Sequence, residues 1–215
     1  MGTQILFHGT PEQCIRPECG KGKARRDFGP GFYLTGDLAL AKEWAVCRPD
    51  GANGYVHRYE LDPDGLRVLD FQEKGVLAWL AELMKHRNAE DTRRYRMLAG
   101  KFIEQYGVET DGWDVIKGWR ADASYFSLAR EFARDNVDRG ILEALLAGGG
   151  FGIQYCIRTE RACSRLHEVP GGLLTVEYAE FHPKYNQRDL AARRHLQDLV
   201  DSDENRVERV FSTLV

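Results

Sequence analysis

The sequence lacks the cysteine spacings that build small disulfide-rich or zinc-dependent folds. Its 215 residues include five cysteines, at positions 14, 19, 47, 156 and 163, an odd number that forms no C-x-x-C pair. The sequence therefore predicts neither a disulfide framework nor a structural metal site, and it favours a reducing compartment such as the cytoplasm.

Long apolar runs and an excess of basic charge are also missing. No stretch approaches the roughly 20 apolar residues that a membrane-spanning helix needs, and the N-terminus lacks the basic flank and apolar core of a signal peptide. With 30 Lys and Arg against 33 Asp and Glu, the formal net charge is -3. This balance disfavours a generally basic nucleic-acid binder, although a local basic patch remains open. We expect a cytoplasmic protein that makes no membrane contact.

What is present is the composition of one globular domain, 43% hydrophobic and long enough to bury a substantial core. Alternating or β-prone runs predict strands at residues 4–8, 32–35, 55–61, 66–70, 113–116, 152–157 and 173–178. Apolar residues at helical spacing predict helices at residues 38–46, within 75–106, within 122–147 and from 183 onward.

Strands near both ends of the chain surround a helical middle, which predicts an α+β fold rather than alternating βαβ units. We expect a main domain over residues 1–182 with a helical insertion at about 75–106. The polar residues 183–215 are expected to form a helical C-terminal extension.

Three short segments, far apart in the chain, carry residue types that suit a nicotinamide-dinucleotide site. Phe7-His8-Gly9-Thr10 ends the first expected strand, Asp27-Phe28-Gly29-Pro30-Gly31-Phe32-Tyr33 leads into the second, and Gln154-Tyr155-Cys156-Ile157 lies on a later one. Asp27-Phe28-Gly29 also matches the magnesium motif of protein kinases. The chain has neither the glycine-rich loop and strand lysine nor the catalytic-loop motif of a kinase, so that interpretation fails.

The chemistry of ADP-ribose transfer explains why such residues belong together. Breaking the bond between ribose and a cationic nicotinamide creates a transition state that resembles an oxocarbenium ion. A protein helps by holding the nicotinamide rigidly and by placing electron-rich oxygen beside the ribose. His8 and Tyr33 have suitable side chains for holding NAD+, and Gln154 can hydrogen-bond ribose hydroxyls without supplying a full negative charge.

With these motifs the chain resembles a bacterial family of unknown function that is placed in the ADP-ribosyltransferase clan. The likeness runs over most of residues 4–165. It includes the N-terminal segments, Gly54-Tyr55-Val56, residues 114–122, Ser124-Tyr125-Phe126 and Gln154-Tyr155. The resemblance implies the split, mainly antiparallel β-sandwich of that clan, with inserted helices, in the branch that relates diphtheria toxin to poly-ADP-ribosylating enzymes.

The resemblance also implies a role for each motif residue. His8 would hold the adenosine-side ribose and Gly9 the nicotinamide amide, and Thr10 is expected among the cofactor-binding residues. Tyr33 would stack on nicotinamide, with Gly31 allowing close approach. Gln154 stands where the poly-ADP-ribosylating relatives carry Glu, which favours single transfer, NAD+ hydrolysis or loss of activity.

Three charged residues complete the expected site. Asp122 is the acid expected to compensate for Gln154 in catalysis, although an Asp before a helix is commonly only an N-cap. Arg26, in a basic loop, and Arg120 are expected to meet the NAD+ pyrophosphate, although such a loop can equally be a solvated surface. Cys156 on an apolar strand is expected to be inert packing.

The sequence thus predicts a mono-ADP-ribosyltransferase that uses NAD+ as co-substrate, without a metal, and modifies an unknown protein or nucleic-acid acceptor. The resemblance suggests a bacterial toxin or effector, with a cognate antitoxin as a further partner. An NAD+ glycohydrolase and a non-catalytic NAD-binding or interaction module are the two alternatives.

Overall fold

The structure of the chain is a computed structural model that describes residues 2–20, 22–87, 92–121, 131–132, 134–147 and 152–201. It confirms the α+β class. The strands are β1 (Gln4–Thr10), β2 (Phe32–Thr35), β3 (Gly54–Leu61), β4 (Val68–Asp70), β5 (Val115–Trp119), β6 (Ile153–Ile157), β7 (Leu166–Glu168) and β8 (Leu174–Val176). The helices are α1 (Leu38–Ala45), α2 (Phe71–Lys74), α3 (Val76–His86), α4 (Arg93–Tyr106), α6 (Arg139–Ala147), α7 (Glu160–Cys163) and α8 (Tyr178–Asp201).

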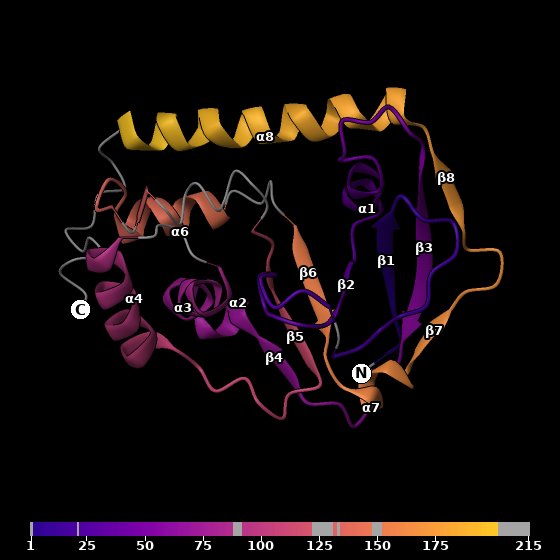
Figure 1. Cartoon of the computed structure of the whole chain (residues 1–215), viewed down its shortest axis with the longest axis horizontal. Coiled ribbons are helices and arrows are strands. Elements are labelled where there is room, and N and C mark those ends of the chain that lie inside the picture. Colours follow the sequence, from indigo (N-terminus) through magenta and orange to yellow (C-terminus); the bar gives the residue numbers. More distant parts are fainter. Residues whose placement is uncertain are drawn as a thin grey trace.

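The strands form one open, mixed sheet in the order β4-β5-β6-β2-β1-β3-β7, with β8 also paired to β3. β4 and β5 run parallel, and the other described pairs are antiparallel. β1 and β2 meet at the single register pair Phe7↔Thr35, whereas β1 pairs with β3 from Gln4 to Thr10. The sheet therefore has a narrow junction at its centre, between two more fully bonded halves (Figure 1).

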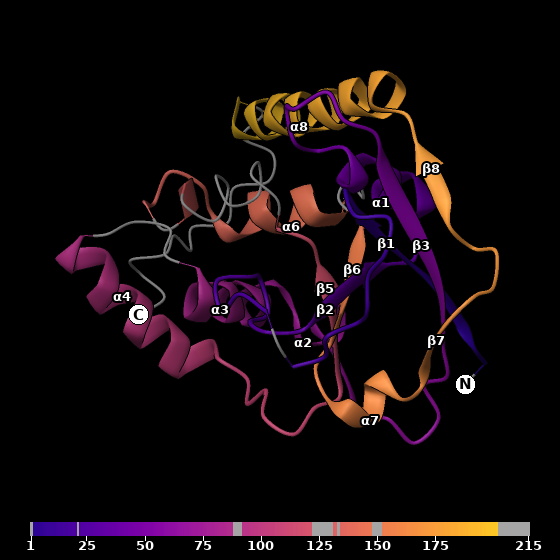
Figure 2. The same ribbon diagram turned by 45° about the vertical axis from the view of Figure 1, so that its right-hand side comes forward.

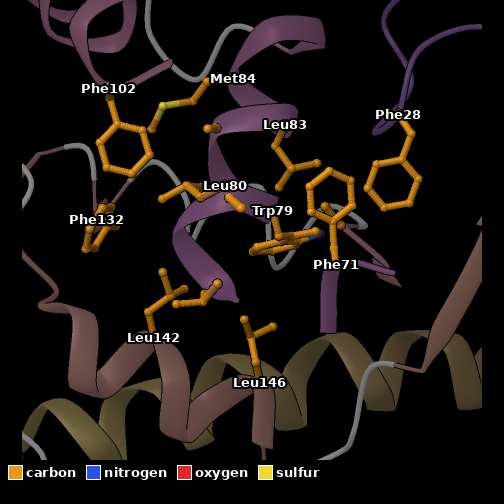
Figure 3. Packing of buried hydrophobic residues seen from close by; sticks show 14 of the residues in the cluster. Phe28, Phe71, Trp79, Leu80, Leu83, Met84, Phe102, Phe132, Leu142 and Leu146 are labelled. Carbon is orange, nitrogen blue, oxygen red and sulfur yellow. The ribbon is translucent and has the colours of Figure 1, made fainter. Parts of the chain in front are cut away.

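The largest hydrophobic core lies between the β4-β5-β6 half of the sheet and helices α3, α4 and α6. Trp79 of α3 is fully buried in it, with rings and aliphatic side chains on several sides (Figure 3). The Trp79 indole Nε1 donates a hydrogen bond to the Trp119 carbonyl at the end of β5, at 2.9 Å. The core thereby fixes the C-terminal end of β5, and the next two residues, Arg120 and Ala121, belong to the candidate site.

Helix α8 crosses the molecule over α1 and α6 (Figures 1 and 2). It begins at Tyr178, five residues before the predicted start at Pro183. Tertiary contacts explain the early start: Asn53 Oδ1 accepts from the Tyr178 N–H at 2.9 Å, and His182 Nδ1 donates to the Val46 carbonyl at 2.8 Å. Among the described helices, none combines the length and apolar character required to cross a bilayer.

The cysteine pattern argued against a disulfide framework, but the structure contains one disulfide. Cys19 and Cys163 form a disulfide with a Cα–Cα distance of 5.9 Å across a sequence separation of 144 residues. The fold brings the loop after β1 against α7, a proximity that cysteine spacing in the sequence cannot reveal. Cys156 is fully buried, and burial raises the pKa of its thiol to about 12, as expected for inert packing.

Candidate functional site

A cavity of about 520 Å³ opens beside the narrow β1–β2 junction. Its lining comes from β1, β2, β6, the loop between β1 and β2, the chain after α3, the end of β5, and helices α1 and α8. This volume lies within the roughly 300–1,000 Å³ range of small-molecule sites. The cavity contains seven of the predicted site residues: His8, Gly9, Thr10, Arg26, Tyr33, Arg120 and Gln154.

His8 is held in one protonation state and one tautomer. Its Nδ1 lies 2.7 Å from the Tyr33 carbonyl oxygen, which can only accept, so Nδ1 carries the proton. Burial lowers the pKa of His8 to about 4, with Arg26 and His57 acting in the same direction. The ring stacks on Phe32 at a centroid distance of 4.5 Å. His8 therefore offers the cavity a neutral imidazole whose Nε2 is an acceptor.

Tyr33 is fixed by the loop that precedes it. Its hydroxyl donates to the Gly29 carbonyl at 2.6 Å and accepts from the Phe28 N–H at 3.0 Å. Burial raises the pKa of this hydroxyl well above its ordinary value, so it stays protonated. The Arg26 guanidinium lies over the ring, 5.3 Å from its centroid. The ring thus already binds a cation at its face.

Gln154 lies on β6, opposite Thr35 of β2 and Gly118 of β5, and is 3% exposed. Its Nε2 donates to Asp27 Oδ2 at 2.7 Å and approaches the Trp119 carbonyl at 3.4 Å. Asp27 is itself 8% exposed and lines the same cavity. The sequence motif drew attention to Asp27, but its contact with Gln154 has no signal in the sequence.

Arginine dominates the charge of the cavity. Arg25, Arg26, Arg48, Arg87 and Arg120 line it, against the carboxylates Glu12 and Asp27. Arg120 packs on Trp44 of α1, with its guanidinium carbon 4.1 Å from the ring centroid. Arg87 is paired with Asp27 at 2.6 Å. The protein has a net negative charge, so this basic lining is a local feature that suits an anionic ligand.

The two glycines of the expected site have structural reasons to be glycine. A Cβ at Gly9 would overlap the Ala41 carbonyl, so Gly9 lets α1 pack on β1. A Cβ at Gly31 would overlap Cys156 Sγ, so Gly31 lets the loop cross β6. Gly31 lines a neighbouring cavity of about 430 Å³ instead, which shares His8, Arg26 and Tyr33 with the first.

Some site residues lie outside the predictions or outside the described chain. Asp122, the expected catalytic acid, falls outside the described residues. The sequence did not indicate that Arg87, Trp44 or Tyr185 of α8 would reach the cavity, because each comes from an element whose position depends on the tertiary fold. Within the described ranges, no three His, Cys, Asp or Glu side chains are grouped to hold a metal ion.

Comparison with known proteins places the chain in a family but gives no activity. Residues 4–167 match the model of a family described as a protein of unknown function, DUF3990. No curated protein and no solved structure gives a significant match. Because the match spans well over half of the chain, the protein belongs to the DUF3990 family.

Proposed function

We propose that the protein is a mono-ADP-ribosyltransferase that uses NAD+, with a fold of the ADP-ribosyltransferase type. One observation carries the proposal: His8, Tyr33 and Gln154, from three different strands, line a single cavity whose wall is rich in arginine. The narrow junction between β1 and β2 is in keeping with a sheet split into two halves around a dinucleotide.

The cavity has a suitable group for each part of NAD+. Arg25 and Arg48, both exposed, can pair with the pyrophosphate, and His8 Nε2 can accept a hydrogen bond from a ribose hydroxyl. The Tyr33 ring now carries the Arg26 guanidinium at its face. A nicotinamide pyridinium, also a cation, would take that position and release Arg26 to the phosphates.

The proposed reaction breaks the bond between C1′ of the nicotinamide ribose and the nicotinamide nitrogen. The bonding electron pair leaves with nicotinamide, which becomes neutral. A nucleophile of the acceptor forms the new bond at C1′ and loses its proton to water. Gln154 supplies a neutral amide rather than a carboxylate, so little at this position would activate a second ADP-ribose, and one unit is transferred.

The biological role is part of the same proposal and rests on the family resemblance. The acceptor would be a protein or a nucleic acid, the protein would act as a bacterial toxin or effector, and a cognate antitoxin would restrain it. An NAD+ glycohydrolase, in which water replaces the acceptor, and a non-catalytic NAD-binding module are the alternatives.

The fate of the ADP-ribose group separates these functions. Purified protein is incubated with cell lysate and NAD+ labelled on its adenylate half. The proposal predicts label on a macromolecule, which protease or nuclease treatment assigns to protein or nucleic acid. Label found only in free ADP-ribose would identify a glycohydrolase, and NAD+ that is bound but intact would identify a binding module. Unbound, intact NAD+ would contradict all three.

A further inference from the structure

Asp27 connects its own loop to three segments that are remote in the sequence. Its Oδ1 accepts from Arg87 Nη1 at 2.6 Å, and its Oδ2 accepts from the Ala121 N–H at 2.9 Å and from Gln154 Nε2 at 2.7 Å. Arg87 caps the end of α3, Ala121 follows β5, and Gln154 lies on β6. Because Asp27 is 8% exposed, the protein must satisfy its charge internally, and these three donors do so.

The partners of Gln154 determine which way round its amide group lies. The Asp27 carboxylate and the Trp119 carbonyl can only accept hydrogen bonds, and both lie on the Nε2 side. The NH2 group must therefore face them, and Oε1 must point the other way. None of the described residues donates to Oε1. This oxygen is the polar atom that Gln154 has left for a ligand in the cavity.

Arg87 prevents Asp27 from acting on a ligand through its charge. Its guanidinium is paired with the carboxylate and also hydrogen-bonds the Ala121 carbonyl, so the Asp27–Arg87 pair is neutral as a unit. Asp27 instead provides a fixed hydrogen-bond acceptor, Oδ2, for the Gln154 amide. Without it, the amide could turn over and present NH2 in place of Oε1.

We propose that Asp27 is a positioning residue that holds the Gln154 amide with Oε1 toward the bound substrate. In NAD+ this oxygen would accept from a ribose hydroxyl and place electron density beside the ribose that develops positive charge. This part of the inference rests on the proposed function; the orientation of Gln154 does not.

Asp27→Asn keeps a side chain of the same size at position 27 but removes one acceptor oxygen. It therefore tests whether Asp27 sets the orientation of the Gln154 amide. The asparagine side chain has one acceptor and one NH2 group, so its NH2 must face either Arg87 or Gln154. The charged Arg87 guanidinium is also held by the Ala121 carbonyl, so it keeps the acceptor oxygen on its own side. The NH2 group then faces the Ala121 N–H and Gln154, and it drives the Gln154 amide to turn over. Adding Arg87→Met removes the opposing donor. In the Asp27→Asn/Arg87→Met double variant, the carbonyl of the substituted side chain can therefore accept from Gln154 and Ala121 again.

The first readout is the ¹⁵N–¹H signal of the Gln154 side-chain amide, identified by its loss in Gln154→Ala. We expect the signal to shift in Asp27→Asn and to return toward its original position in the double variant. Asp37→Asn, which changes an exposed α1 cap outside both cavities, is the matched control and should leave the signal unmoved. A Gln154 signal that is unchanged in Asp27→Asn would overturn the proposal, whether or not the protein cleaves NAD+.

The second readout is nicotinamide release. We expect kcat to fall about 100-fold in Asp27→Asn, the loss typical of a misplaced group near the reacting atoms, with KM changed far less. The double variant should recover most of kcat. If the amide signal returns in the double variant but kcat does not, orientation is not the role of Asp27 and the proposal is wrong. A wild-type protein that releases no nicotinamide would contradict the proposed function alone, and the amide signal would still decide the orientation.

Discussion

At the scale of single residues, His8 is held in one orientation and one protonation state. The imidazole donates from Nδ1 to the Tyr33 carbonyl, stacks on Phe32 and is kept neutral by burial. A neutral imidazole with a fixed tautomer is a reliable acceptor at Nε2, and this state holds across the whole physiological pH range.

The neutral state of His8 predicts a pH dependence of stability. Between pH 6.5 and about 4, the unfolded chain binds a proton at His8 that the folded chain does not. The free energy of unfolding should therefore fall as pH falls through this window, and the contribution should be fully present above pH 6.5. His8→Asn places an amide NH2 group where Nδ1 lies, so it keeps a donor for the Tyr33 carbonyl but does not titrate.

Urea unfolding of both proteins at several pH values between 4 and 7 measures this effect, and the other titrating groups cancel in the difference. The stability of wild type should decline more steeply toward acid than that of His8→Asn. Parallel curves would show that His8 is not buried in its neutral form.

Gln154→Glu places two carboxyl groups side by side. The introduced carboxyl group would face Asp27 Oδ2 and the Trp119 carbonyl, which are both acceptors, so it should hold a proton near neutral pH. We expect the rate of NAD+ hydrolysis by this variant to rise with pH as that proton leaves. The rate should exceed that of wild type only at alkaline pH. Rates of nicotinamide release from pH 6 to 9 test this, and an identical pH profile in both proteins would move residue 154 away from the reacting ribose.

The sequence could predict which residue types the cavity uses, but not how they are supported. His8, Tyr33 and Gln154 do line one cavity. Asp27 was noticed only within a motif, because its partners Arg87, Ala121 and Gln154 are 60, 94 and 127 residues away. Gly9 and Gly31 looked like ligand contacts, yet their lack of a side chain is required by packing against α1 and β6.

At the scale of elements, α8 extends the site beyond the family region. It lies after residue 167, where the family match ends, yet it contributes Tyr185 to the cavity wall. The Arg188 guanidinium binds both carboxylate oxygens of Glu43 of α1, at 2.7 and 2.8 Å, and Glu43 is 3% exposed. This bidentate pair attaches α8 to the element that carries Trp44.

Arg188→Met should loosen that attachment. The substitution removes the cation that pairs with the buried Glu43 carboxylate. We expect the free energy of unfolding to fall by about 3 kcal/mol. This is the low end of the cost of removing one partner of a buried ion pair, because the Arg188 side chain is partly exposed. NAD+ affinity should fall as well, because Tyr185 moves with α8.

Arg193→Met is the matched control for this change. Arg193 makes an exposed pair with Asp189 within α8, so its loss should change stability by no more than about 0.5 kcal/mol. Urea unfolding and NAD+ titration of both variants give the comparison. Equal effects of the two substitutions would show that the Arg188–Glu43 pair does not hold α8.

Periodicity predicted the longer elements and failed where tertiary contacts decide. The α1 helix, with its Asp37 N-cap, and strands β2, β3 and β6 follow from local pattern. Three short elements, α2, α7 and β7, were not predicted, because their largely polar residues show neither a β-prone run nor a helical spacing of apolar residues. The predicted helix over 122–147 is interrupted in its described part: residues 134–137 form a turn and a bend before α6, and Asp135 has a φ of 63°.

At the scale of the whole molecule, the order of strands could not be read from the chain. β2 lies between β1 and β6, so strands separated by more than a hundred residues become neighbours. It is this arrangement that brings the three sequence motifs together. The α+β class follows from the order of the predicted strands and helices, whereas the central junction and the Cys19–Cys163 link depend on contacts that are distant in the sequence.

The disulfide should contribute strongly to stability because it closes a loop of 144 residues. The chain-entropy rule gives about 5 kcal/mol for such a loop, an upper value for natural disulfides. Cys19→Ser/Cys163→Ser should therefore unfold at much lower urea concentration than wild type, and dithiothreitol should destabilise wild type but not the double variant. Cys14→Ser, at an exposed free cysteine, is the control. A wild-type protein insensitive to dithiothreitol, with no linked Cys19–Cys163 peptide, would contradict the assignment.

Nicotinamide release measures whether this molecule cleaves NAD+ in the cavity around His8, as the proposed function requires. Purified wild type and His8→Ala are compared, with cell lysate as a source of acceptors and circular dichroism to verify that both are folded. We predict release by wild type that is lost in His8→Ala. No release by wild type would contradict the proposed function, and equal release by the folded variant would show that His8 is not part of the site.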